Sequence, residues 1–337
     1  MDRSTVLVTG GNSGIGFECA RRLAAAGWRV LVASRNSAAS ADAVRRIIRE
    51  CGNDAVSALS LDLGSIASVR RFVREIEAAD VPLRALVCNA GLQLSHGLER
   101  SADGFELTFA VNHLGHFVLA NLLLGRLAAN APARIVIVAS GVHDPKLRTG
   151  MPKPRIDDIA TLAATDGGHQ GGFDGRLAYV NSKLCNLWFA YELARRIGRA
   201  GLRNLTVNAF DPGLVPGSGL ARDYPPALRF VWNRILPAAA RVLTRVVAGI
   251  NPAPKAGGAL AALVLDPALA NVSGKYFPSH TRWREAPSSD ASYDVDRAVL
   301  LWDESVRMSK LVPADSPLVS DAARHAGTPA DTSQAGS

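Results

Sequence analysis

The chain has 337 residues, of which 48% are hydrophobic and 20% charged, and its formal net charge is +8. This composition describes a globular chain with ample material for a core, which excludes a disordered protein. No run of about 18 uncharged apolar residues occurs, so we expect no membrane span.

The charge and the cysteines narrow the function classes further. Six of the 38 basic residues are lysines, and the arginines are scattered without a basic run interleaved with aromatics. We therefore expect a solvated surface with some attraction for anionic ligands and no nucleic-acid partner, nucleic-acid binding being a weak alternative. The four cysteines form no C-x-x-C pair, so neither a disulfide framework nor a metal site is indicated.

Short apolar runs alternate with helical patterns from the first residues onward. The N-terminus MDRSTVLVTGG enters a strand at once, leaving no room for a signal peptide, so we expect a cytoplasmic protein. The expected strands are STVLVTG (4–10), RVLVAS (29–34), AVSALSL (55–61), RALVCNAG (84–91), RIVIVAS (134–140) and LTVNAF (205–210). The expected helices end at Ala26, begin near Ala38, and cover 65–79, about 105–129 and 176–196. This alternation predicts an α/β fold with a doubly wound, mostly parallel Rossmann sheet and helices on both faces.

We expect one domain over residues 1–312, with two long interruptions. Gly and Pro break the alternation at about 141–175, an insert, and at about 213–253, a lid. The lid stretch 230–250 carries apolar and basic residues and reads as a helix that ends near Pro237 and restarts after it. It could line the entrance for a large apolar substrate, lie on a membrane surface or pack on the sheet, and packing is favoured. Small polar residues predict a disordered tail over 313–337.

A glycine-rich motif, TGGNSGIG, spans Thr9 to Gly16, after the first strand and at the start of the first helix. Glycines let the backbone approach a pyrophosphate, and a helix N-terminus offers free N–H groups. The alternative is a glycine-rich turn that binds nothing. The second strand ends in Ala33-Ser34-Arg35, where a site that prefers NAD usually has an acidic residue. An arginine there suits the 2′-phosphate of NADP(H), the alternative being a surface arginine.

The helix 176–196 carries a second unusual pattern. Its apolar stripe is Val180, Leu184, Leu187, Trp188 and Tyr191, and Tyr179 and Lys183 stand beside that stripe, one turn apart. A tyrosine ionises near pH 10, so it is a poor acid or base at neutral pH unless a neighbouring cation tunes it. In isolation the pair would be an ordinary feature of a helix edge.

Together and in order, the motifs resemble the short-chain dehydrogenase/reductase family over roughly residues 4–280. TGGNSGIG matches the family's TGxxxGxG, Asp62-Leu63 its acidic dipeptide, Asn89-Ala90-Gly91 its NAG, Asn112 its helix asparagine, Ser140 its serine, Tyr179 and Lys183 its YxxxK, and Pro212-Gly213 its PG. The resemblance implies these cofactor-binding residues: Thr9, Gly10, Asn12, Ser13, Gly14, Ile15, Gly16, Arg35, Asp62, Leu63, Asn89, Ala90, Gly91, Tyr179, Lys183, Pro212 and Gly213.

The resemblance also implies four catalytic roles. Tyr179 would protonate the developing alkoxide, while Lys183 would favour the tyrosinate and hold the nicotinamide ribose. Asn112 would order a water behind Lys183, and Ser140 would hydrogen-bond the substrate oxygen. The expected function is therefore an NADP(H)-dependent oxidoreductase for a bulky hydrophobic carbonyl or alcohol. The alternative, from a non-enzymatic class of function, is a regulator that binds the cofactor without catalysing a reaction.

One departure from the family concerns spacing, because Ser140 and Tyr179 stand 39 positions apart, with an insert between them. The insert and its flanks resemble the branch of retinol dehydrogenases and light-dependent protochlorophyllide reductases, the latter more closely around FDG and SKLCN. Reduction of a ring double bond is thus a further alternative. Cys185 stands where the protochlorophyllide reductases also carry cysteine, either as a buried small residue, which is favoured, or as a proton donor. The branch includes monomers, so a monomer is slightly favoured over a homo-oligomer.

Overall fold

The computed structural model describes residues 4–94, 97–164, 172–219, 230–237 and 249–320. A seven-stranded parallel sheet runs through its centre in the order β3-β2-β1-β4-β5-β6-β7. The strands are β1 (Thr5–Thr9), β2 (Arg29–Ser34), β3 (Val56–Ser60), β4 (Leu83–Cys88), β5 (Ala133–Val138), β6 (Leu205–Asp211) and β7 (Lys275–Pro278). The doubly wound fold expected from the sequence is confirmed, with β7 as a strand that the sequence had not indicated.

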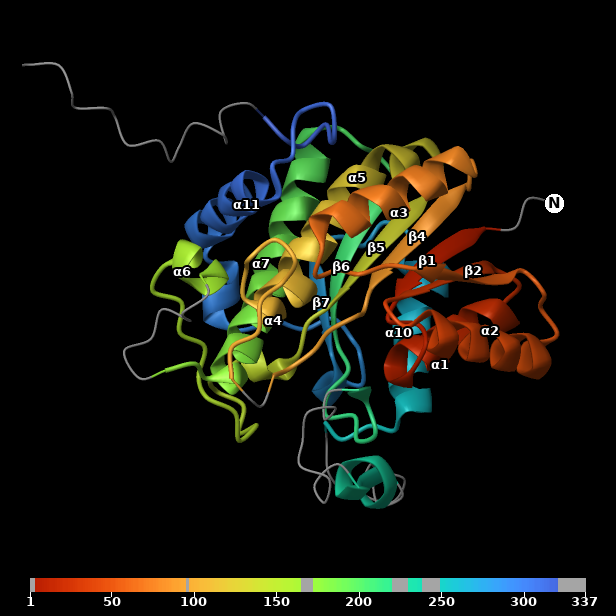
Figure 1. Cartoon of the computed structure of the whole chain (residues 1–337), viewed down its shortest axis with the longest axis horizontal. Helices are drawn as coiled ribbons and strands as arrows, with labels where there is room; N and C mark the ends of the chain where they lie inside the picture. The colour runs from red at the N-terminus through yellow and green to blue at the C-terminus, as the bar shows by residue number, and fades with distance from the viewer. Residues whose placement is uncertain (1–3, 95–96, 165–171, 220–229, 238–248, 321–337) are drawn as a thin grey trace, which may run out of the picture.

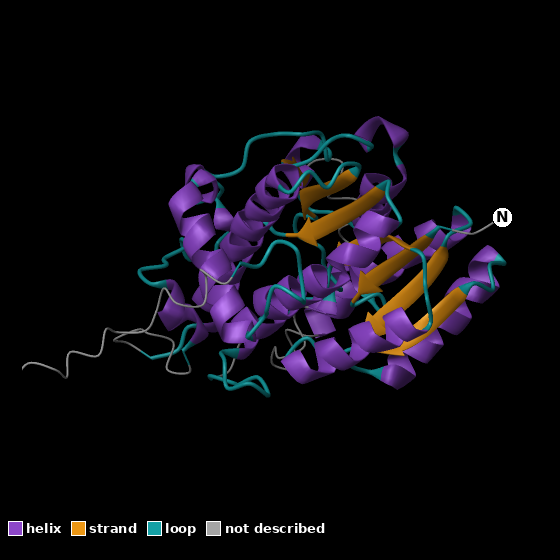
Figure 2. Cartoon of the chain, turned by 90° about the horizontal axis from the view of Figure 1, so that it is seen from above, coloured by secondary structure: helices purple, strands orange, loops and turns teal. Residues whose placement is uncertain are grey.

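Helices cover both faces of the sheet (Figures 1 and 2). One face carries α1 (Gly14–Ala25), α2 (Ser37–Cys51) and α10 (Ala253–Leu265), and the other carries α3 (Ile66–Ala78), α5 (Gly115–Ala129), α7 (Gly175–Arg199) and α11 (Val295–Ser309). Successive side chains of a strand point to opposite faces of the sheet and so contribute to two separate cores. Leu7 packs toward α5 and α7, while Val6 and Val8 pack toward α1 and α10. Parallel strands buried on both faces explain the nearly continuous apolar runs in the sequence.

The helix expected around residues 105–129 forms in three joined pieces. They are α4 (Leu107–Phe109), a π-helical turn (Ala110–Leu114) and α5. The segment Leu107–Ala129 is long and apolar enough to cross a membrane, but 89% of its most apolar window is buried inside the domain. It is therefore a core helix, and its π turn places Asn112 at the bend.

Helices α1 and α10 cross closely on the other face. At Gly257, a Cβ would lie 2.8 Å from Ile15 O and 2.8 Å from Cys19 N. Backbone therefore packs on backbone, which holds the first turn of α1 in place.

The C-terminal segment packs on the domain and corrects one expectation. Residues 313–320, expected in a disordered tail, are ordered: Asp315 pairs with Arg70 at 2.9 Å, and Ser316 donates to Asn121 at 3.0 Å. Leu318 and Val319 are buried against the core. Polar anchors on the domain thus order a segment whose own composition is typical of a loop. Residues 321–337 lie outside the described residues.

The insert and the lid are described in part. The insert contains a 3-10 turn (Gly141–His143) and α6 (Ile159–Ala163), and its residues 165–171 lie outside the described part. In the lid, a π-helical turn covers Val231–Ile235. The expected restart of the helix after Pro237 falls on 238–248, which lie outside the described residues.

Candidate active site

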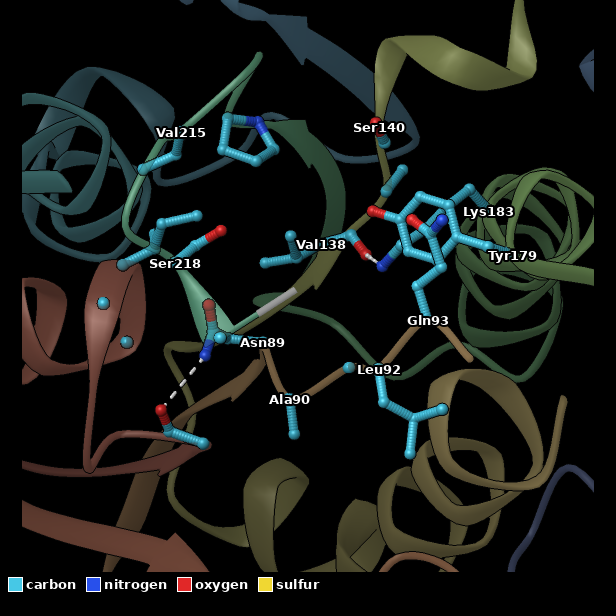
Figure 3. Close-up of a pocket in the computed structure, with 18 of the residues that line it drawn as sticks. Asn89, Ala90, Leu92, Gln93, Val138, Ser140, Tyr179, Lys183, Val215 and Ser218 are labelled. Atoms are coloured by element: carbon cyan, nitrogen blue, oxygen red, sulfur yellow. Dashed lines mark hydrogen bonds between the residues drawn. The ribbon is translucent and has the colours of Figure 1, made fainter. Parts of the chain in front are cut away.

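A cavity of about 1250 Å³ opens at the carboxyl ends of the strands (Figure 3). In doubly wound sheets this edge is where ligands bind. The structure brings these sequence-predicted residues to the cavity wall: Gly10, Asn12, Ser13, Gly14, Ile15, Gly16, Arg35, Asp62, Leu63, Asn89, Ala90, Gly91, Ser140, Tyr179, Lys183, Pro212 and Gly213. Thr9 and Asn112 are fully buried behind the wall.

The glycine-rich turn at the start of α1 lets a ligand come close to the protein backbone. Gly10 and Gly14 have φ values of +63° and +56°, which favour glycine. Gly16 packs against Gly10 O and the Asn89 amide, where a Cβ has no room. The N-cap residue Ser13 makes no side-chain capping bond, so the first N–H groups of α1 keep their capacity for an anion.

Thr9 fastens this turn to the strand that follows across the sheet. Its Oγ1 accepts hydrogen bonds from Asn89 N at 2.9 Å and from Ala90 N at 3.0 Å. The Asn89 side chain in turn donates to Thr9 O at 2.8 Å. Residues 9 and 89–90 therefore form one rigid floor under the cavity.

Arg35 lies at the carboxyl end of β2, on the cavity wall and exposed. Its guanidinium makes no hydrogen bond or ion pair with any residue that the structure describes. The neighbouring Ser34 bonds to Ser40 at 2.6 Å, and Asn36 caps α2 by accepting from Ala39 N at 2.9 Å. The arginine thus stands beside a helix N-terminus, a combination suited to a phosphate group.

Tyr179 and Lys183 project from α7, which Asp174 caps by accepting from Arg176 N and Leu177 N at 2.8 and 3.2 Å. Lys183 is 4% exposed, its Nζ donates to Val138 O at 3.2 Å, and this ammonium lies 5.5 Å from the centre of the Tyr179 ring. Burial lowers the pKa of Lys183 to about 8, and the nearby Asp211 carboxylate opposes that shift.

The Asn112 side chain connects this helix with the loop after β4. Its Oδ1 accepts from Leu92 N at 2.8 Å, and its Nδ2 donates to Leu92 O and to Ser182 Oγ, each at 2.9 Å. Ser182 Oγ donates onward to Tyr179 O at 2.7 Å. One amide therefore sets the position of Leu92 relative to the backbone of Tyr179.

The sequence reasoning missed three residues of the site. Asp211, 3% exposed at the end of β6, lines the cavity and accepts from Gly213 N at 2.8 Å, which orders the Pro-Gly turn. Gln93 lines the cavity two residues after the NAG motif. His116 lies under the floor, beside Thr9. Adjacency to the matched motifs was a signal for the first two, whereas His116 is recognised through its long-range contacts.

Cys185 does not belong to the cavity. Its side chain is fully buried in a cluster with Leu184, Trp188 and Ile159 of the insert, and burial raises the pKa of its thiol. A thiol kept neutral in an apolar cluster is a packing residue, as the favoured interpretation of the sequence held.

The cavity fits a bound dinucleotide by its own geometry. At one end of the cavity, the glycine backbone of the turn lies at the N-terminus of α1, and Arg35 lies on the cavity wall beyond this turn. At the other end stand the polar groups of Ser140, Tyr179 and Lys183. The described residues contain no group of three or more His, Cys, Asp or Glu side chains that could hold a metal ion.

Comparison with known proteins shows what the chain is similar to. The model of the short chain dehydrogenase family matches residues 4–149. The chain is 33% identical to the chloroplastic short-chain dehydrogenase TIC 32 A of Brassica napus, over 92% of this chain and 89% of that protein. It is 34% identical to a chloroplastic protochlorophyllide reductase of Chlamydomonas reinhardtii, over 91% of this chain and 78% of the reductase.

Among solved structures, an uncharacterized protein from Mycobacterium paratuberculosis superimposes with a TM-score of 0.66 and 29% sequence identity, over 91% of this chain and 93% of that chain. The similarity to the curated relatives extends over nine-tenths of the chain, well past the cavity residues contributed by α7 and β6. The chain therefore belongs to the short-chain dehydrogenase/reductase family of oxidoreductases.

Proposed function

We propose that this protein transfers hydride between NADP(H) and a bulky apolar carbonyl or alcohol compound. The observation that carries the proposal is the meeting of Ser140, Tyr179 and Lys183 in one cavity with the glycine-rich turn of α1. When bound, NADPH supplies a hydride to the carbonyl carbon, and in the opposite direction NADP⁺ takes it back.

The chain's own residues handle the oxygen and the proton. Ser140 Oγ donates a hydrogen bond to the carbonyl oxygen, and Tyr179 gives its phenolic proton to that oxygen as the C–O double bond becomes single. Lys183, held by Val138 O, keeps a positive charge beside the resulting tyrosinate and binds the nicotinamide ribose. Asn112, through Ser182, fixes the position of the Tyr179 backbone relative to the loop after β4.

The outer part of the cavity supports an apolar substrate. Its lining there includes Leu147, Met151, Leu214, Val215 and Trp232, drawn from the insert and from the segment after β6. Leu214 is 47% exposed and Leu147 36%, although large apolar side chains usually avoid water. A bulky apolar substrate would cover these side chains and gain from their burial.

A hydride-transfer experiment tests the proposal. NADPH deuterated at C4 of the nicotinamide is supplied with retinal, steroid, quinone and polyketide ketones, and products are examined by mass spectrometry. We expect an alcohol with deuterium on the former carbonyl carbon. Deuterium on a carbon of a reduced C=C bond would instead support the protochlorophyllide-reductase-like alternative. Cofactor binding without turnover of any carbonyl compound would contradict the proposal in favour of a regulator.

A further inference from the structure

Gln93 is a buried polar side chain whose carboxamide has no partner in the described protein. The residue is 5% exposed and lines the cavity, where Figure 3 shows its side chain in the same region as Tyr179. Neither its amide nitrogen nor its amide oxygen hydrogen-bonds to any residue that the structure describes. A carboxamide on the cavity wall that bonds to no described residue keeps its donor and its acceptor for a ligand that fills the cavity.

The position of Gln93 is fixed relative to the catalytic tyrosine. The preceding residue, Leu92, is held through both its N–H and its C=O by the Asn112 amide. Asn112 donates to Ser182, which donates to Tyr179 O. A chain of hydrogen bonds thus links the backbone at 92 to the backbone at 179, which fixes the backbone next to Gln93 relative to Tyr179.

Several polar groups near the reacting oxygen already have tasks. The Asn89 amide donates to Thr9 O, and Asp211 accepts from Gly213 N. In the proposed reaction, Ser140 and Tyr179 both serve the reacting oxygen. The Gln93 carboxamide remains for a second polar atom of the substrate.

We propose that Gln93 determines substrate specificity by binding a second oxygen next to the reacting carbonyl. This inference rests on the proposed carbonyl reduction and names its substrate class: carbonyl compounds with an adjacent carbonyl or hydroxyl group. The amide NH₂ donates to an adjacent carbonyl, and the amide oxygen accepts from an adjacent hydroxyl. A substrate that lacks the second oxygen leaves the carboxamide unpaired, and that penalty is the source of the discrimination.

The test uses three aryl ketones of similar size: propiophenone, 1-phenyl-1,2-propanedione and 2-hydroxypropiophenone. We compare the wild type with Gln93→Met, which keeps the side-chain length without the amide, and with Gln93→Glu, which accepts but does not donate when ionised. For each substrate with a second oxygen, kcat/KM is divided by the value for propiophenone. Comparing this ratio between proteins cancels the intrinsic reactivity of the dione.

We expect Gln93→Met to lower both ratios by about tenfold or more, because kcat/KM falls for the substrates with a second oxygen and rises for propiophenone, which no longer leaves an amide unpaired. Gln93→Glu should lower the ratio for the dione and retain the ratio for the hydroxyketone. Arg84→Ala, a change at an exposed residue of β4 that does not line the cavity, should leave both ratios as in the wild type. The NADPH dissociation constant should be equal in all four proteins.

Two results overturn the inference while the proposed function stands: equal ratios in the wild type and Gln93→Met, or a loss confined to NADPH affinity. Turnover of none of the three ketones by the wild type would count against the proposed carbonyl reduction and against this inference with it.

Discussion

His116 Nε2 lies 2.9 Å from Thr9 Oγ1, beneath the floor of the cavity. The other ring nitrogen, Nδ1, lies 3.1 Å from Asn112 O. A carbonyl accepts only, so Nδ1 carries the hydrogen and Nε2 accepts, which gives the Thr9 hydroxyl two acceptors, His116 Nε2 and Val87 O at 3.2 Å. Burial lowers the pKa of His116 to about 4, so the ring is neutral at physiological pH. One imidazole thus joins the glycine-rich turn to the bend that carries Asn112.

Replacing His116 with leucine should affect both stability and cofactor binding. The change removes both buried hydrogen bonds of the imidazole, so we expect the free energy of unfolding to fall by about 1–3 kcal/mol. NADPH should also bind several-fold more weakly, because the imidazole no longer supports Thr9 and the glycine-rich turn from below. Denaturant titration and fluorescence titration with NADPH measure the two effects.

His113 provides the matched control on the same helix. It is equally buried, but it bonds only to Ser305 Oγ, whose own hydrogen goes to Leu301 O, and its Nδ1 has no partner in the described structure. His113→Leu should therefore leave NADPH affinity unchanged, and any loss of stability comes from its ring contacts with Phe109, Phe117 and Phe189. Equal effects of the two substitutions on NADPH binding would contradict the special role of His116.

The charge of Lys183 predicts a pH dependence. Its pKa of about 8 in the free protein means that the ammonium is lost as the pH rises through 8. Because the protonated form serves the reaction, kcat/KM for NADPH should fall above about pH 8. Asp211→Asn keeps an oxygen that accepts from Gly213 N but removes the charge that raises the lysine's pKa. The fall should then begin at lower pH.

Asp144→Asn is the control for that shift, since Asp144 acts on His143 and Lys146 but not on Lys183. A pH profile for Asp211→Asn that overlays the wild type would show that the carboxylate does not sustain the ammonium. Initial rates between pH 6 and 10 decide the outcome.

Tyr179→Phe and Lys183→Ala should give different kinetic defects. Phenylalanine keeps the packing of the ring and removes the acid, so we expect turnover to fall by roughly 100-fold or more with NADPH affinity preserved. Lys183→Ala removes the group proposed to bind the ribose as well as the charge, so both turnover and NADPH affinity should fall. Steady-state kinetics with equilibrium binding separates the two; full activity of Tyr179→Phe would remove the proposed acid from the mechanism.

Arg35 should make the chain prefer NADPH to NADH. Its guanidinium, which pairs with no residue that the structure describes, can form paired, charge-assisted bonds to a 2′-phosphate. Arg35→Ala should weaken NADPH binding and leave NADH binding nearly unchanged. Arg45→Ala, a change on exposed α2 at an arginine already paired with Asp42, should alter neither. Equal dissociation constants of the wild type for both cofactors would refute the assignment.

The covering of α7 by α11 favours a monomer. Many relatives associate through the helices that carry the asparagine and the YxxxK pair, but here Trp302 of α11 packs on Phe117 and Phe189 of those helices. Leu318 and Val319 extend the same core. Light scattering across a range of concentrations should give one chain per particle, and a stable dimer or tetramer would show that another face is used.

The sequence predicted most of the sheet because six of its strands are apolar runs between recognisable helices. It did not indicate β7, which has four residues, or α10, whose alanines and glycines lack an amphipathic period. For the site, local motifs located Tyr179 and Lys183, since the chemistry depends on their spacing along one helix. The tasks of Gln93 and His116 depend on contacts between segments far apart in the chain, which no local pattern encodes.

The contact between Gly257 and the first turn of α1 affects how damaging a sequence variant of this chain is expected to be. Ile15, whose carbonyl meets Gly257, also lines the cavity, whereas no residue of α10 does. An alanine at position 257 would push on the backbone that presents N–H groups to the cofactor. Gly257→Ala, a small change on a helix that does not line the cavity, would thus be more damaging than many changes at the cavity mouth.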